Sequence, residues 1–429
     1  MIDIKLIRER TDFVKNGLTR LGAPTDIIDT IIELDQRRRQ LLTEVESLKG
    51  ERNSVSKTIP RVTDAAERDR KIAEMRLLGA RIASLDAEVQ SVDATLQKRM
   101  LEVPNLPHEA TPLGHDESEN VVVRQIGEPR AFDFEPKPHW ELGEKLGILD
   151  IARGVKISGS RFYVLKSAGA ALQRALIAFM LDVHIREHGY TEIYPPLLVR
   201  EDCLYGTGNL PKFGENLYHD VEDDLWLIPT AEVPVTNLYR EEILEADLLP
   251  IRHVAYSACF RREKMSAGRD VRGIKRGHQF DKVEMVKFVE SSQSDTELES
   301  LVADAEDICR RLEIPHRVVQ MCTADLSFSA AMKYDIEIWA PRAGGEEGEW
   351  LEVSSCSNFR DFQARRAGIR YRPSKGARPE YVHTLNGSGL ALPRTLIAVI
   401  ENYQNEDGSI TVPGALKPYL NGLDKLEGE

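Results

Sequence analysis

Residues 260–284 read FRREKMSAGRDVRGIKRGHQFDKVE, and this stretch decides how the rest of the chain is interpreted. It joins two largely apolar runs, His253–Phe260 and His278–Val289, through a loop rich in Gly, Arg and Lys. Two such runs joined by a polar, glycine-containing loop predict neighbouring strands of an antiparallel sheet. The stretch therefore predicts a β-hairpin with a basic loop at its end.

A basic–acidic pair predicted on the first strand and an aromatic residue on the returning strand suit a nucleoside triphosphate. Arg261 can pair with a phosphate, Glu263 can accept from the amino group of adenine, and Phe280 can stack on the base. Four more cations can steer phosphates, namely Arg269, Arg272, Lys275 and Arg276. Taken alone, the same pattern also fits a solvated hairpin whose charges pair with one another.

Two further segments carry groups of the same kind. Glu352–Ser355 places a carboxylate and a hydroxyl on a predicted strand, which suits Mg²⁺ held between phosphates. The segment NGSGLALPR, residues 386–394, predicts a glycine-rich turn that opens a helix and offers Arg394 to an anion. Because proline is tolerated only in the first turn of a helix, Pro393 predicts a helix start at about Leu392. Neither a Walker loop nor a strand-linked GxGxxG is present.

The second part of the chain mixes helix and strand patterns. Helices are predicted at 168–187, 291–312 and 390–403, and strands at 121–125, 192–199 (with a proline break), 225–229, 253–260, 278–289, 318–321, 334–339 and 348–355. Consecutive strands with short turns, and no βαβ series, predict an antiparallel sheet with helices packed on it, an α+β fold.

The first part has a heptad pattern. Apolar residues recur every seven positions in two segments, as Leu34, Leu41, Leu48 and Val55 and as Met75, Ile82, Val89, Leu96 and Val103. Pro60 lies between them and stops a helix. The pattern predicts two long helices that fold back as an antiparallel coiled coil. It suits a dimerisation element or spacer, or an arm whose arginines contact a large partner.

Composition bounds the class of protein. The chain has 429 residues, 41% hydrophobic and 30% charged, with 57 Lys and Arg against 70 Asp and Glu, a net charge of −13. This acidity argues against a protein that coats nucleic acid, although a site in one domain stays possible. No apolar run approaches the roughly 18 residues needed to span a bilayer. Five scattered cysteines favour a reducing, cytoplasmic location and no disulfide framework.

Together these motifs resemble a known family. The FRxE strand, the GxG…R segment and the segment from Gly189 to Pro196 resemble motifs 2, 3 and 1 of class II aminoacyl-tRNA synthetases. Narrower motifs are similar to those of bacterial-type seryl-tRNA synthetases, namely TAE (230–232), GTGNLP (206–211), GRDVRG (268–273), HQFDKVE (278–284), SSCSN (354–358) and TLNGSG (384–389). The opening MIDIKLIR and the helical hairpin match as well.

The resemblance implies roles for particular residues. Serine would contact Thr230, Ala231, Glu232, Glu284 and Ser388. ATP would contact Arg261, Arg262, Glu263, Gly277, Phe280, Glu352, Val353, Ser354, Ser355 and Arg394. Arg261, Glu263 and Arg394 would be catalytic, and Glu352 and Ser355 would hold Mg²⁺ through ATP.

The resemblance also implies an organisation and a set of partners. Residues 1–110 would be a helical tRNA-binding domain, 111–138 a linker and 139–429 the catalytic domain. The enzyme would be a cytoplasmic homodimer, without a membrane partner, that attaches L-serine to serine tRNA through seryl-adenylate and also serylates selenocysteine tRNA where that tRNA is present. There are two alternatives. One is a paralogue that activates an amino acid and loads it onto a carrier protein without charging tRNA, and the other is a coiled-coil scaffold whose synthetase-like domain is inactive.

Overall fold

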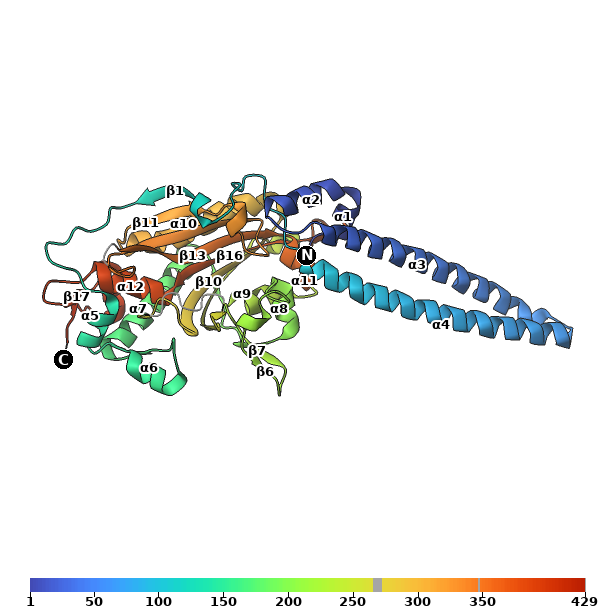
Figure 1. The fold of residues 1–429 in the computed structure, drawn as a ribbon, viewed down its shortest axis with the longest axis horizontal. Coiled ribbons are helices and arrows are strands. Elements are labelled where there is room, and N and C mark those ends of the chain that lie inside the picture. Colours follow the sequence, from blue (N-terminus) through green and yellow to red (C-terminus); the bar gives the residue numbers. More distant parts are fainter. Residues whose placement is uncertain (265–271, 346–347, 429) are drawn as a thin grey trace. The chain divides into compact units, whose positions relative to one another are not determined.

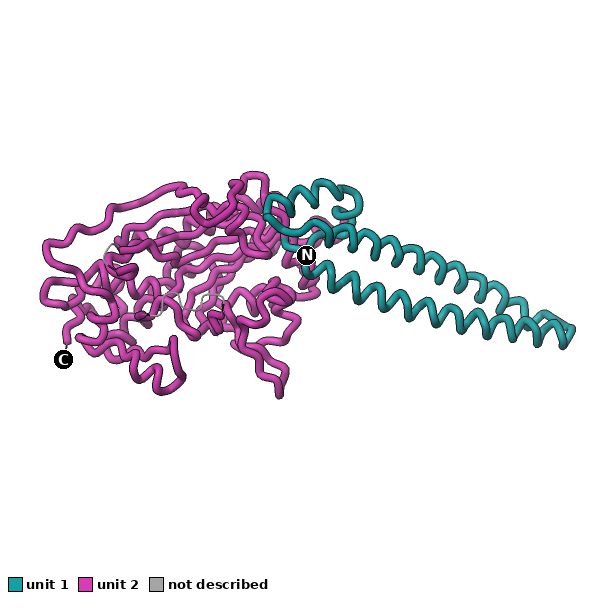
Figure 2. Tube along the Cα trace, viewed as in Figure 1, with its two compact units in different colours: residues 1–104 teal, residues 105–429 magenta. Residues whose placement is uncertain are grey.

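The computed structural model describes residues 1–264, 272–345 and 348–428 (Figure 1). The chain divides into two compact units, Met1–Pro104 and Asn105–Glu429 (Figure 2). Arg269, which the sequence analysis names as a phosphate-steering residue, lies outside the described residues.

The first unit is helical throughout. Its helices are α1 (Ile4–Glu9), α2 (Thr11–Arg20), α3 (Asp26–Thr58) and α4 (Ala65–Glu102). A 3-10 turn containing Pro60, Ile59–Arg61, separates α3 from α4, and the Asp64 carboxylate caps α4 by accepting from the Ala66 and Glu67 N–H groups. The predicted helical hairpin is confirmed.

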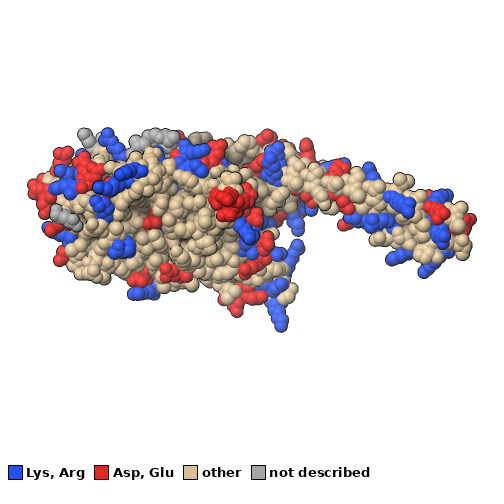
Figure 3. Space-filling model, turned by 90° about the horizontal axis from the view of Figure 1, so that it is seen from below, with Lys and Arg blue, Asp and Glu red and all other residues tan. Residues whose placement is uncertain are grey.

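The hairpin is held by an apolar seam flanked by ion pairs. Leu41 and Val45 of α3 pack with Leu85 and Val89 of α4. Ion pairs join the two helices at Arg37–Glu88, Arg38–Asp93, Arg81–Glu44 and Lys49–Asp86. Figure 3 shows Lys and Arg interspersed with Asp and Glu along this unit. Three of the arginines that the sequence suggests for phosphate contact thus pair with carboxylates of the opposite helix, and two more, Arg39 and Arg70, pair within their own helices.

The second unit is built on an eight-stranded sheet of order β1-β11-β12-β13-β16-β10-β9-β4. In chain order its strands are β1 (Val121–Ile126), β4 (Thr191–Glu192), β9 (Ile251–Phe260), β10 (Gln279–Val289), β11 (His316–Gln320), β12 (Met332–Ala340), β13 (Glu349–Arg360) and β16 (His383–Ala391). Every pair is antiparallel except β4 with β9. The predicted α+β class with an antiparallel sheet is therefore confirmed.

Helices cover both faces of this sheet. They are α5 (His139–Lys145), α6 (Ile151–Ser158), α7 (Ser167–Arg186), α8 (Glu201–Thr207), α9 (Glu232–Thr236), α10 (Ser294–Arg311), α11 (Phe362–Ala367) and α12 (Leu392–Asn402). Helices α7, α10 and α12 form the main core on one face, and α9 and α11 form a second core on the other. By length and composition α7 could cross a membrane, contrary to the sequence expectation, yet its Leu172, Leu176 and Phe179 lie in the main core.

Small sheets complete the unit. They are β2 (Leu149–Asp150) with β3 (Val164–Leu165), β5 (Leu198–Arg200) with β7 (Leu225–Leu227) and β6 (His219–Asp220), β8 (Ile243–Glu245) with β14 (Arg370–Arg372) and β15 (Glu380–Tyr381), and β17 (Ile410–Thr411) with β18 (Lys425–Leu426).

Three local predictions are wrong. The predicted strand 192–199 is two short strands in different sheets, because the two prolines between them supply no N–H for a ladder. The predicted glycine-rich turn at 386–389 belongs to strand β16. Arg261 and Glu263 follow β9 rather than lying on it. The predicted start of α12 at Leu392 is confirmed, with Pro393 in its first turn.

Candidate functional site

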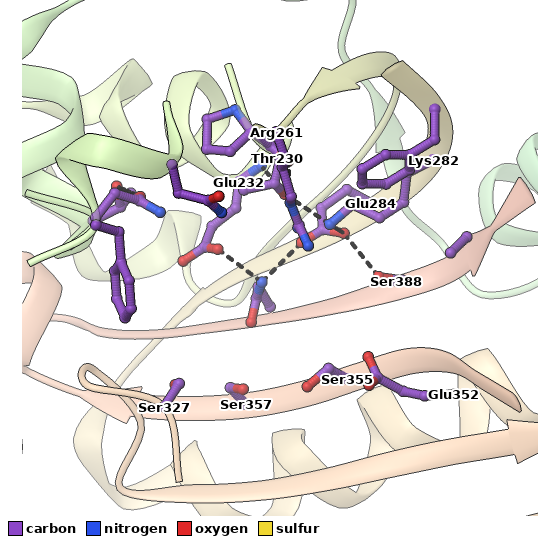
Figure 4. A pocket seen from close by; sticks show the side chains of 18 of the residues that line it. Thr230, Glu232, Arg261, Lys282, Glu284, Ser327, Glu352, Ser355, Ser357 and Ser388 are labelled. Atoms are coloured by element: carbon purple, nitrogen blue, oxygen red, sulfur yellow. Dashed lines mark hydrogen bonds and ion pairs between the residues drawn. The ribbon is translucent and has the colours of Figure 1, made fainter. Parts of the chain in front are cut away.

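A cavity of about 470 Å³ opens at the strands β10, β13 and β16 and is closed by α9 and the start of α12 (Figure 4). Side chains alternate across a strand. On β10 the odd residues Val283 and Met285 therefore enter the main core, while Phe280, Lys282 and Glu284 line the cavity. The strand thus places three chemically different groups along one wall.

Two carboxylates converge at one end of the cavity. Glu232 comes from the first turn of α9 and Glu284 from β10. The Asn386 amide lies between them and donates to Glu232 Oε2 at 3.0 Å and to Glu284 Oε1 at 2.8 Å (Figure 4). A single side-chain amide thus fixes the spacing of the two acids.

Further polar groups complete this acidic end. Buried Lys282 pairs with Glu284 at 2.8 Å and donates to Thr230 Oγ1 at 2.8 Å. The Ser388 hydroxyl donates to Glu284 Oε2 at 3.2 Å. Two carboxylates therefore face one ammonium, and a second cation would balance the charge.

The Glu232 carboxyl has an altered proton affinity. Withdrawal from water and the nearby charge of Glu284 raise the pKa of Glu232 to about 7, although the hydrogen bond from Gln363 opposes the shift. Gln363 Nε2 donates to Glu232 Oε1 at 2.6 Å, and its own amide oxygen accepts from Thr384. A ligand ammonium placed here would favour the ionised carboxylate.

The other end of the cavity is basic. Lys275, Arg276 and Arg394 line it, and Arg261 lies between the two ends, because its charge acts on both Glu232 and Glu352. Arg394 Nη1 donates to the Glu352 carbonyl at 2.6 Å and lies 3.7 Å from its carboxylate. Burial would raise the pKa of Glu352, but the Arg394 and Lys333 charges hold it below its ordinary value. This end is suited to a polyanion.

At the base of the loop, Arg261 and Phe280 lie close together. The Arg261 guanidinium lies 5.1 Å from the centre of the Phe280 ring. Arg276 pairs with Glu263 at 3.6 Å. Glu263 has a φ of 50°, a left-handed conformation that non-glycine residues adopt rarely and that concentrates at functional sites.

The oxygen donors at Glu352 and Ser355 fit a magnesium ion bound mainly through phosphate. Both line the cavity from β13, beside the basic end. Mg²⁺ commonly takes one or two protein oxygens plus phosphate oxygens and waters. Within the described residues no group of three or more His, Cys, Asp or Glu could hold a metal by itself. The donor set therefore suits a metal that arrives with its nucleotide.

Most of the predicted site residues meet in this one cavity. It is lined by Thr230, Glu232, Arg261, Glu263, Gly277, Phe280, Glu284, Glu352, Val353, Ser355, Ser388 and Arg394. Four others do not line it, one of which is Arg272. Ala231 is fully buried, Arg262 donates to the Leu217 carbonyl at 2.8 Å, and the buried Ser354 hydroxyl lies 3.4 Å from Cys356 Sγ.

Three polar residues of the acidic end, Lys282, Asn386 and Gln363, were not predicted from the sequence. Lys282 could have been found, because it alternates with Phe280 and Glu284 on one strand. Asn386 stands opposite Val286 in the sheet register, so its position depends on strand pairing. Gln363 supports Glu232 from α11 and carries no sequence signal of its own.

The chain matches known families and proteins along its length. Residues 1–107 match the family model described as seryl-tRNA synthetase N-terminal domain, and residues 215–403 match the tRNA synthetase class II core domain (G, H, P, S and T). Serine--tRNA ligases of Thermomicrobium roseum and a Roseiflexus species are 64% and 62% identical over 99% of this chain and 95% and 99% of theirs. The crystal structure of seryl-tRNA synthetase from Pyrococcus horikoshii complexed with ATP superposes with a TM-score of 0.92, at 38% identity and full coverage of both chains.

Proposed function

The chain belongs to the seryl-tRNA synthetases, the class II serine--tRNA ligases, and from this premise we propose that its cavity forms seryl-adenylate from L-serine and ATP. The observation that carries the proposal is the division of charge within one cavity. Glu232 and Glu284 lie at one end, Arg276 and Arg394 lie at the other beside Glu352, and Arg261 lies between them. Serine brings an ammonium, and ATP brings a triphosphate.

The acidic end would hold serine. Its ammonium would bind Glu232 and Glu284 and supply the second cation that these carboxylates lack. Thr230 and Ser388 lie within the same hydrogen-bonded cluster and can meet the serine hydroxyl. A site that hydrogen-bonds a substrate hydroxyl rejects an analogue without it far better than a plain apolar pocket does. Alanine should therefore be a poor substrate.

The basic end would hold ATP and activate it. A carboxylate oxygen of serine forms a bond to the α-phosphorus while the bond from that phosphorus to the bridging oxygen breaks and pyrophosphate leaves. Arg261 would stabilise the charge that develops on the α-phosphate, and Arg276 and Arg394 the charge on the departing phosphates. Phe280 would stack on adenine, and Glu263 would accept from its amino group.

Transfer would follow in the same cavity. A hydroxyl of the terminal adenosine of tRNA attacks the seryl carbonyl carbon and loses its proton to solvent, and the bond from that carbon to the phosphate oxygen breaks to release AMP. Positioning of the two substrates would supply much of the acceleration in this step. Glu352 and Ser355 would hold Mg²⁺ with ATP, where the metal supplies charge neutralisation on the phosphates.

The first unit would select the tRNA. Arg52, Arg61, Arg68 and Arg76 lie along the distal part of the hairpin and make no ion pair among the described residues. They are available to phosphates, and we propose that they contact the long variable arm of serine tRNA. Selenocysteine tRNA would be a second substrate by the same contacts, since an arm that reads the backbone carries no information about the anticodon.

We propose that the enzyme works in the cytoplasm as a homodimer. Tyr194, in the segment that resembles motif 1, is 86% exposed, and Leu198, two residues after that segment, is 47% exposed. Exposed large apolar side chains that gather in one segment favour a protein contact. Sedimentation equilibrium should give twice the chain mass of 48.4 kDa.

The proposed function is tested by serine-dependent exchange of pyrophosphate into ATP, with threonine, alanine and cysteine as controls, followed by charging of serine tRNA. Exchange and charging with serine support the proposal. Exchange without charging would identify the carrier-loading alternative. No exchange with any amino acid would leave the inactive scaffold.

A further inference from the structure

A buried histidine and glutamate lie behind the basic end of the cavity and are used by no step proposed so far. His139, the first residue of α5, is 1% exposed, and Glu401 near the end of α12 is fully buried. His139 Nδ1 lies 2.7 Å from Glu401 Oε1, and the His139 N–H donates to the same oxygen at 3.0 Å. Glu401 Oε2 accepts from the Arg342 N–H at 2.8 Å.

The other side of the imidazole contacts the basic loop. Its Nε2 accepts a hydrogen bond from the Ile274 N–H at 3.2 Å. A backbone N–H can only donate, so Nε2 carries the lone pair and Nδ1 carries the hydrogen that Glu401 accepts. The ring is therefore neutral, and the glutamate selects its tautomer.

Gly273 gives a second, independent sign of this contact. Its φ is +68°, and a Cβ built there would lie 2.0 Å from His139 Nε2. Any other residue at 273 would strain the backbone and displace the ring. The chain therefore brings its backbone against this imidazole at a position that only glycine allows.

The contact fixes the segment that returns from the basic loop, residues 273–277, which we call the returning limb. Ile274 anchors it in the main core, and the next residues, Lys275, Arg276 and Gly277, line the cavity. Arg394 and Glu401 are seven residues apart, which places them on one face of α12. The dyad thus ties the returning limb to the helix that carries Arg394.

We propose that His139, oriented by Glu401, is a positioning residue for adenylate formation that holds the returning limb so that Lys275 and Arg276 meet the triphosphate. It touches no substrate. This inference rests on the proposed function for its kinetic consequence, but the hydrogen bond itself can be measured without any substrate.

Two substitutions separate the two sides of the ring. His139→Asn places an amide N–H near Nδ1, so it keeps the bond to Glu401 and loses the acceptor for Ile274. His139→Gln can place its amide oxygen near Nε2, so it keeps that acceptor. The asparagine variant should raise the KM for ATP roughly three- to tenfold, as expected for one lost hydrogen bond, with the KM for serine unchanged. The glutamine variant should restore the KM for ATP toward the wild-type value.

Hydrogen exchange of the Ile274 amide in the full chain, without substrates, is the second readout. It should be about tenfold faster in the asparagine variant than in the glutamine variant. The proposal would be overturned if the Ile274 amide were equally protected in both variants and the KM for ATP of the asparagine variant were unchanged. It would also be overturned if that variant raised the KM for ATP and the KM for serine equally. If neither variant folds, hydrogen exchange of the Ile274 amide in the wild-type chain tests the proposal. Exchange as fast as that of an amide in an open loop would refute the hydrogen bond to His139. Loss of wild-type pyrophosphate exchange with a protected Ile274 amide would contradict the proposed function alone.

Discussion

At the scale of single residues, Glu232 sets the expected pH dependence. Its pKa is raised to about 7 by burial and by Glu284. Below that value the carboxyl is increasingly protonated and no longer attracts an ammonium, so the KM for serine should rise as pH falls, by up to about tenfold per pH unit. Steady-state exchange kinetics between pH 5.5 and 8 measure this, with the KM for ATP as the internal control.

Glu232→Gln tests the same assignment. The variant should raise the KM for serine about ten- to a hundredfold at pH 8, because a charge-assisted hydrogen bond is lost, and the dependence on pH should flatten. A pH profile equal to that of the wild type would show that another group titrates.

Arg261 and Arg262 form a natural matched pair. Arg261→Ala should lower the rate of pyrophosphate exchange about 10²- to 10³-fold while circular dichroism stays unchanged, because a preorganised charge at the α-phosphate is removed. Arg262→Ala removes a side chain that lies against the Leu217 carbonyl and the Tyr218 ring, outside the cavity, and should retain exchange within a few fold. Equal losses in both would place Arg261 in a structural role.

Site residues could be predicted from the sequence where a charged side chain had one evident ligand. Arg261 and Arg394 could be picked out from sequence because cationic groups beside a polar loop or a glycine-rich segment suggest anions as ligands, whereas Glu284 was named only through the family resemblance. Asn386 could not, because a neutral amide gains its meaning only from the two acids that the fold brings beside it. Ser354 was predicted to contact ATP because it lies in a stretch of site residues. Its neighbours line the cavity, but Ser354 itself does not.

At the scale of elements, the distal hairpin makes a measurable prediction. Replacing Arg52, Arg61, Arg68 and Arg76 by alanine should raise the KM for tRNA and reduce the slope of log affinity against log salt by roughly 3, since each phosphate contact contributes about 0.7–0.9. Pyrophosphate exchange should not change. Alanine at Arg39 and Arg70, which pair with Asp35 and Glu74 within their own helices, is the control. An unchanged slope would remove the hairpin from the tRNA contact.

Elements with long periodicity were predictable, and glycine-containing ones were less so. The heptads located both arms of the hairpin because a repeated seam leaves few alternative structures. Strand β16 was misread as a turn because its glycines suggest one. In the fold they serve close packing, since a Cβ at Gly389 would lie 2.3 Å from His184 Nε2 and one at Gly387 would lie 2.8 Å from Cys356 Sγ. Those neighbours are distant in sequence.

At the scale of the whole molecule, the two units should be separable in function. Deleting residues 29–103 leaves the cavity residues in place, because all of them belong to the second unit. The truncated enzyme should form seryl-adenylate at close to the wild-type rate and should charge tRNA at least a hundredfold more slowly. Measuring exchange and charging on one preparation checks both, and normal charging would make the hairpin a spacer.

The boundary between the units after Pro104 has a meaning for translation. Under the proposed function, the second unit distinguishes amino acids and the first distinguishes tRNAs. Neither unit recognises the substrate that the other selects. A hairpin exchanged with that of a relative would redirect serine to a different set of tRNAs without altering a single contact to serine. The assignment of serine to its codons would then depend on the covalent link that keeps the two units in one chain.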